Sequence, residues 1–181
     1  MDAYTTWVAA HSLTAAAVQF GLLGTLGEII SHLIVTRRPG LPCGLGALLA
    51  KILGWAVLGV IIKYGFTGMK GFTSALLDHQ LLPAMCSNGL GRAFAVSVLT
   101  NTFFGPQMMA FHRLTDNLIL RRRGFAGLQR AWWTLLWFWI PAHTLTFSLP
   151  QDYQVGLAAV WSVVLGIILG LSGAQGPRRA R

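Results

Sequence analysis

Residues 21–38 read GLLGTLGEIISHLIVTRR, and this stretch decides how the chain is interpreted. It is apolar almost throughout, yet it carries Glu28 and His32, which share one face of a helix because they are four residues apart. A soluble protein can hydrate such a face. A protein surrounded by lipid has to bury the face or turn it toward a polar cavity.

The composition of the whole chain favours the second situation. Of 181 residues, 54% are hydrophobic and only 10% are charged. In a typical soluble domain about 25% of the residues are charged. The length suits one domain, residues 1–181. We therefore predict an all-α integral membrane protein.

Five apolar stretches have about the 20 residues that a helix needs to cross the hydrocarbon core. We expect a polytopic transmembrane helical bundle with four or five spans, at residues 13–35, 45–62, 93–110, 132–149 and 155–171. Residues 66–82 have apolar positions at helical spacing, interrupted by charged ones. They are expected to form an interfacial helix or, alternatively, to continue the second span.

Basic residues mark one side of the predicted bundle. With five spans, nine arginines fall on the same side: Arg37, Arg38, Arg121, Arg122, Arg123, Arg130, Arg178, Arg179 and Arg181. By the positive-inside rule this side faces the cytosol or the matrix, and the amino terminus lies opposite. The net charge of +9 then indicates contact with anionic lipid near Arg121, Arg122 and Arg123, and not with nucleic acid.

Small and polar residues form a stripe along the first predicted span, at steps of three or four residues. Small side chains let another helix approach closely, and the packing candidates are Gly21, Gly24 and Ser31. Glu28 and His32 lie on or beside this stripe. They either line a polar cavity or pair with a neighbouring helix.

The third span repeats this pattern with Asn101, Gly105, Met108, His112 and Asp116. His112 and Asp116 lie toward the arginine-rich end, which favours an interfacial salt-bridge cluster over a catalytic dyad. Pro106 interrupts the apolar run and is expected to kink the helix, since proline removes a backbone hydrogen bond.

The fourth span places Trp137 and Trp139 near Pro141 and His143. Pro141 is a second expected kink. The two tryptophans either pack against this kink or line a site for an apolar or cationic ligand.

The sequence contains no motif of a known soluble enzyme class and no cysteine spacing typical of a metal site, so neither a cofactor nor a metal is expected. Cys43 and Cys86 fall in loops on opposite sides of the predicted bundle. A disulfide between them is therefore excluded in this layout.

Four stretches, in chain order, resemble the twenty-two-kilodalton peroxisomal membrane protein family, whose members also reside in the mitochondrial inner membrane. They read TLGEIISHLIVTRR, LLDHQLLP, NTFFGP and WFWIPAHTLTFSLPQDYQVG. The positions that fit the family pattern are Glu28, Leu77, Asp78, Pro83, Phe104, Pro106, Trp137, Pro141, Phe147, Pro150 and Tyr153. Several polar positions depart from it, with histidine in place of glutamine at His32 and His143. The resemblance implies a helical bundle, conventionally of four spans, that forms small-solute pores or supports metabolite balance in these organelles.

The leading hypothesis is an organellar membrane pore for small solutes, in which Glu28, His32, Asn101 and His143 face a shared polar interior. One alternative is a membrane-embedded enzyme, such as an isomerase or cyclase, that acts on a lipophilic metabolite, because titratable side chains and deep tryptophans suit proton transfer and cation stabilisation. Another is a non-catalytic scaffold. Location in the endoplasmic reticulum and homo-oligomerisation stay open.

Overall fold

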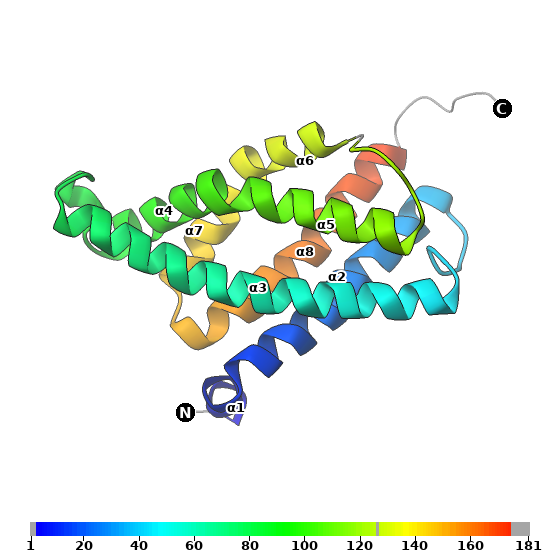
Figure 1. Cartoon of the computed structure of the whole chain (residues 1–181), viewed down its shortest axis with the longest axis horizontal. Coiled ribbons are helices and arrows are strands. Elements are labelled where there is room, and N and C mark those ends of the chain that lie inside the picture. The colour runs from blue at the N-terminus through cyan, green and yellow to red at the C-terminus, as the bar shows by residue number, and fades with distance from the viewer. Residues whose placement is uncertain (1–2, 126, 175–181) are drawn as a thin grey trace.

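The computed structural model describes residues 3–125 and 127–174, and every regular element in this part of the chain is helical (Figure 1). The all-α prediction is confirmed. The elements are α1 (Ala3–Ala10), α2 (Ser12–Thr36), α3 (Leu45–Asp78), η1 (Ala84–Cys86), α4 (Gly89–Leu99), η2 (Thr100–Phe104), α5 (Gly105–Ile119), α6 (Leu128–Thr134), η3 (Leu135–Trp139), α7 (Ile140–Ser148) and α8 (Gln151–Ala174). The tail arginines, Arg178, Arg179 and Arg181, lie outside the described residues.

Two of the helical rods contain a wider turn. The elements α4, η2 and α5 follow one another without a break, as do α6, η3 and α7. Both η2 and η3 are π-helical: Gly105 N–H bonds the carbonyl of Thr100, and Ile140 N–H bonds that of Leu135, five residues back in each case. The predicted kink residues, Pro106 and Pro141, each lie two residues after the end of the π turn. A proline cannot donate a backbone hydrogen bond, and a π turn accommodates this loss within a continuous rod.

Among the described residues, two helices are long and apolar enough to cross a membrane, α2 and α3. The stretches expected at 93–110 and 132–149 are each divided by a π turn into pieces shorter than one span. The stretch at 155–171 lies within α8.

Of the two alternatives for residues 66–82, the separate interfacial helix is wrong, and residues 66–78 instead continue the helix of the second predicted span. Residues 66–78 belong to α3, which runs for 34 residues, or roughly 51 Å at 1.5 Å per residue. Glycines and charged residues interrupt the apolar pattern here, but there is no proline before Pro83 to stop the helix. The helix ends at Asp78, and Gln80 then adopts a left-handed conformation, with φ of 57°.

Small residues allow α2 to pack closely against both α3 and α8. The predicted packing residues Gly21 and Gly24 face α3, where a Cβ on Gly21 would lie 3.3 Å from the Ile52 carbonyl oxygen and one on Gly24 would overlap the Trp55 ring. On the side of α8, Gly27 and Gly166 lie against each other. The buried cluster beside these contacts contains Ala16, Phe20, Phe66, Val155, Ala158 and Ala159.

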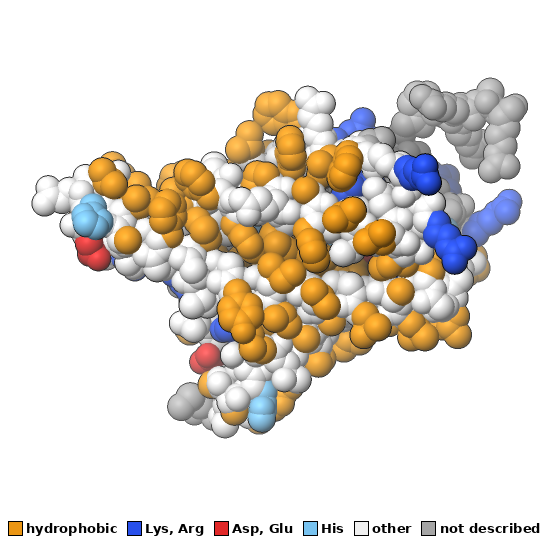
Figure 2. All heavy atoms as spheres, viewed as in Figure 1, with side chains coloured by type: hydrophobic (Ala, Val, Ile, Leu, Met, Phe, Trp, Pro, Cys, Tyr) orange, Lys and Arg blue, Asp and Glu red, His pale blue; other side chains and the backbone are white. Residues whose placement is uncertain are grey.

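Charged and apolar side chains are separated on the surface. Figure 2 shows Lys and Arg side chains gathered at the end of the molecule where α2 and α5 end and α3 begins. Large apolar side chains are exposed along the rods, among them Leu22, Leu53, Val57, Phe94 and Leu118. Such an apolar surface is typical of contact with lipid or with another apolar partner. We call the charged end the basic end.

Candidate functional site

A cavity of about 670 Å³ lies between the helix halves nearest the basic end. Its wall comes from the C-terminal half of α2, the N-terminal half of α3, α5, the rod from α6 to α7, and α8. It reaches the loops of the basic end, where Pro42 and Arg122 line it. At the other extreme, Phe20, Phe66 and Ala158 belong both to the cavity wall and to the buried cluster. We call this extreme the inner end, and the cavity is closed there by close packing.

Three charged side chains from three helices meet on the cavity wall. Lys51 Nζ of α3 lies 2.6 Å from Glu28 Oε2 of α2 and 2.6 Å from Asp116 Oδ1 of α5. The lysine side chain is 5% exposed, and the two carboxylates are 22% and 25% exposed. We call this group the Lys51 triad. One lysine is therefore paired with two carboxylates and offsets half of their charge inside the bundle, where an unpaired charge is costly.

Two aromatic side chains hold the triad in place. Trp55, one turn after Lys51 on α3, donates a hydrogen bond from Nε1 to Glu28 Oε1 at 2.8 Å. The ring of His112 lies against that of Trp55, with the ring centroids 4.4 Å apart. His112 and Asp116 are four residues apart on α5 and so share one face.

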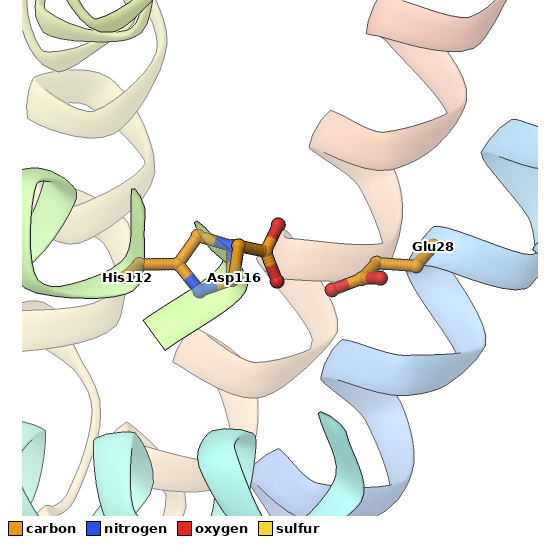
Figure 3. Close-up of side chains that lie close together, drawn as sticks. All are labelled: Glu28, His112 and Asp116. Atoms are coloured by element: carbon orange, nitrogen blue, oxygen red, sulfur yellow. The ribbon is translucent and has the colours of Figure 1, made fainter. Parts of the chain in front are cut away.

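Glu28, His112 and Asp116 lie close enough to be considered as metal ligands (Figure 3). One ligand atom from each falls within 4.8 Å of the others. The ammonium group of Lys51 is bound to both carboxylates at 2.6 Å, however, so a cation from the chain itself already occupies their inward-facing oxygens. The three residues therefore form an ion-pair cluster with Lys51 and fit a metal centre less well.

Neutral polar side chains line the inner end. Asn101 donates hydrogen bonds from Nδ2 to the Ser97 carbonyl at 2.8 Å and to His143 Nδ1 at 3.1 Å. Because the amide nitrogen can only donate, Nδ1 of His143 accepts, and the proton of the neutral ring is on Nε2. Asn101 is 3% and His143 9% exposed. This pair links the two rods that contain the π turns.

Two further polar groups of the inner end are buried without a hydrogen-bond partner among the described residues: the Thr100 hydroxyl and the Trp139 Nε1–H. Both residues line the cavity, and both belong to π turns. Thr102, in the same turn, bonds the Val98 carbonyl one turn back, as helical threonines commonly do. Unsatisfied groups of this kind are costly and are typical of functional positions.

The structure brings together most of the residues singled out in the sequence. Glu28, His32, Asn101, His112, Asp116, Trp139 and His143 all line the cavity, as does Ser31. Trp137 does not: its side chain is 54% exposed on the outer surface. Both alternatives given for Glu28 apply, since it lines the cavity and also pairs with Lys51 of the neighbouring helix α3. Asp116 forms a salt bridge to the same lysine.

Sequence reasoning missed Lys51 and Trp55. Lys51 is the only charged residue in the predicted second span, residues 45–62, so the reasoning that singled out Glu28 applies to it equally. Nothing in the sequence marks Trp55 as a donor to Glu28, because that contact depends on how α2 and α3 are rotated against each other.

Comparison of the chain with protein-family models, curated proteins and solved structures found no match. A function for this chain therefore has to be inferred from the cavity.

Proposed function

We propose that this chain is a multi-pass organellar membrane protein that lets small solutes cross the bilayer, and that the cavity is one half of the path. The resemblance to the twenty-two-kilodalton peroxisomal membrane protein family supports a peroxisomal or mitochondrial inner membrane. Two helices suited to crossing a membrane, and rods of similar length beside them, support insertion as a bundle of four or five spans.

The observation that carries this proposal is the charged wall of the cavity. Three helices place Lys51, Glu28 and Asp116 against a cavity of about 670 Å³ that reaches the basic end. Polar side chains at membrane depth are tolerated when they face the bundle interior or water, and they commonly mark a solute path. A bundle built only for stability gains nothing from a hollow of this size.

The inner end acts as the closed gate of this path. Phe20 and Phe66 block it with aromatic rings, while Asn101 and His143 supply hydrogen-bonding groups beside them. The π turns of η2 and η3 lie at this level, and π turns are weaker points of a helix where the backbone can rearrange. Opening the gate then requires the two rods to move apart at η2 and η3.

The experiment that tests the proposal is solute efflux from sealed liposomes containing the purified protein. The wild type is expected to release small solutes, and Glu28→Gln is expected to change the rate for charged solutes at least about threefold by altering the charge inside the cavity. Asp152→Asn is the matched control, because Asp152 lies in the first turn of α8, away from the cavity wall. A folded wild type without efflux, or identical effects of the two substitutions, contradicts the proposal.

A second candidate is an enzyme that acts on a lipophilic substrate inside the membrane. It is favoured by His112, which can exchange protons between two nearby carboxylates beside the Trp55 ring. Membranes containing only this protein would then convert a lipophilic substrate, and His112→Gln would abolish turnover. Efflux without turnover decides for the pore.

A further inference from the structure

The inward face of α3 continues past the closed inner end of the cavity to a second cationic group. Lys70 lies four residues after Phe66, so it occupies the same face one turn further from the basic end. Its Nζ donates to Gln154 Oε1 of α8 at 3.1 Å. Gln154 in turn lies four residues before Ala158, which lines the inner end. Lys70 is therefore placed behind the gate.

A second cation lies beside Lys70. Arg92 of α4 donates from Nη2 to Ser74 Oγ at 2.7 Å, and Ser74 is one turn beyond Lys70 on α3. Lys70 and Arg92 are both half-buried, and within the described part of the chain neither forms an ion pair with a carboxylate. We call Lys70, Ser74, Arg92 and Gln154 the far cluster.

Cationic side chains without a carboxylate partner also lie at the basic end of the cavity. Arg113 and Arg122 line the cavity, and neither has a carboxylate partner among the described residues. The only lysine or arginine with such partners in this region is Lys51, which is bound to both Glu28 and Asp116. The cavity wall thus carries three cationic side chains, Lys51, Arg113 and Arg122, and two carboxylates, Glu28 and Asp116.

The positive-inside rule explains the arginines of the basic loops but not the far cluster. That rule places Lys and Arg in loops on one side of the membrane. Lys70 and Arg92 lie within helices, on the opposite side of the gate from those loops. Half-buried cations that are hydrogen-bonded only to neutral groups keep their charge available to attract an anion.

We propose that the solute conducted along this path is an anion. This inference rests on the proposed function and adds the charge class of the solute. An anion meets Arg122 and Arg113 first, then the Lys51 triad, then the neutral groups of Asn101, Thr100 and Trp139 at the gate, and finally the far cluster. A cation would be repelled at both ends of this route, because each has two cations without bound carboxylates.

The first test is the reversal potential of the reconstituted wild type in a potassium chloride gradient. Chloride is expected to be more permeant than potassium. Arg113→Gln and Lys70→Gln are each expected to lower the chloride preference about two- to fivefold, the effect of one partly screened charge. Glu28→Gln is expected to raise it. Arg38→Gln is the control, since Arg38 is exposed in a basic loop and does not line the cavity.

A second test does not require conduction and so separates this inference from the proposed function. In a variant without the native cysteines, Ser31→Cys on the cavity wall carries a bimane fluorophore. Iodide is expected to quench it more strongly than caesium, relative to free bimane, and Arg113→Gln is expected to reduce the difference. If the protein does not conduct but iodide still quenches more strongly than caesium, the proposed pore is contradicted, whereas the inference that the cavity attracts anions is supported. Potassium preference, or equal quenching by both ions, overturns the anion assignment.

Discussion

At the scale of single residues, the Lys51 triad explains how the chain tolerates charge among apolar helices. Each of its three members would be expensive alone, and two short ion pairs and the Trp55 hydrogen bond remove most of that cost. Glu28 is thus tolerated in the apolar stretch 21–38 because it pairs with Lys51 on the next helix.

Removing the shared lysine is expected to be far more damaging than removing one carboxylate. Lys51→Met leaves two carboxylates facing each other without a cation and should cost about 3–5 kcal/mol of folding stability. Glu28→Gln leaves the pair of Lys51 with Asp116 intact and should cost about 1–2 kcal/mol. Thermal unfolding in detergent measures both.

The triple variant Lys51→Met, Glu28→Gln, Asp116→Asn is the control for this prediction. It removes all three charges and should recover most of the stability lost by Lys51→Met, since no unpaired charge remains. Equal stability of Lys51→Met and Glu28→Gln would contradict the shared-partner interpretation.

At the scale of elements, two helical rods share one local design. In each, a π turn begins six residues before a proline, at Thr100 for Pro106 and at Leu135 for Pro141. Both turns face the inner end of the cavity. On the proposed gating, these paired turns are the level at which the bundle opens.

The two π turns are expected to exchange their backbone hydrogens faster than the middle of α3. Local opening is easier where helical hydrogen bonds are irregular, and we expect a difference of at least about tenfold between residues 100–105 and residues 55–60. Hydrogen exchange of the protein in nanodiscs, followed by mass spectrometry, measures it. Uniform protection along all rods would argue against a gate at η2 and η3.

The contact of α2 with α8 depends on glycine. A Cβ on Gly27 would lie 3.0 Å from the Ser162 carbonyl oxygen, so Gly27→Ala is expected to cost about 1–3 kcal/mol by forcing the helices apart. Gly68→Ala is the matched control, since a Cβ there meets nothing within 4 Å among the described residues. It should be neutral or stabilising by up to about 1 kcal/mol. Chemical unfolding compares the two, and equal effects would show that the α2–α8 contact is not tight.

Elements were easier to predict from the sequence than their contacts. Apolar runs predicted the positions of α2 and α8 because helix formation is local. For residues 66–78 the sequence left two alternatives, an interfacial helix and a continuation of the second span, because charged residues interrupt their apolar pattern. The pairing of Lys51 with Asp116, 65 residues away, depends on how helices rotate and approach. The π turns were not predicted either, because a proline shows only that a hydrogen bond is lost and not how the helix compensates.

At the scale of the whole molecule, the bundle is hollow toward its basic end and closely packed toward the other. Cys43 precedes α3, and Cys86 follows it, so a membrane-spanning α3 separates them. A membrane-impermeant maleimide added outside sealed vesicles is therefore expected to label only one of the two cysteines, and to label the other after permeabilisation. Single variants Cys43→Ser and Cys86→Ser identify each band. Labelling of both from the same side would contradict the spanning arrangement.

If solutes pass through the cavity, a reagent attached to its wall has to slow them. Met108→Cys, on the wall, and Arg38→Cys, in an exposed loop, are each placed in a Cys43→Ser, Cys86→Ser background and modified with a charged methanethiosulfonate reagent in liposomes. Modification is expected to reduce solute efflux by at least about tenfold for Met108→Cys, because it adds bulk and charge to the cavity wall, and to leave efflux unchanged for Arg38→Cys. Undiminished efflux after complete modification of Met108→Cys would contradict passage through the cavity.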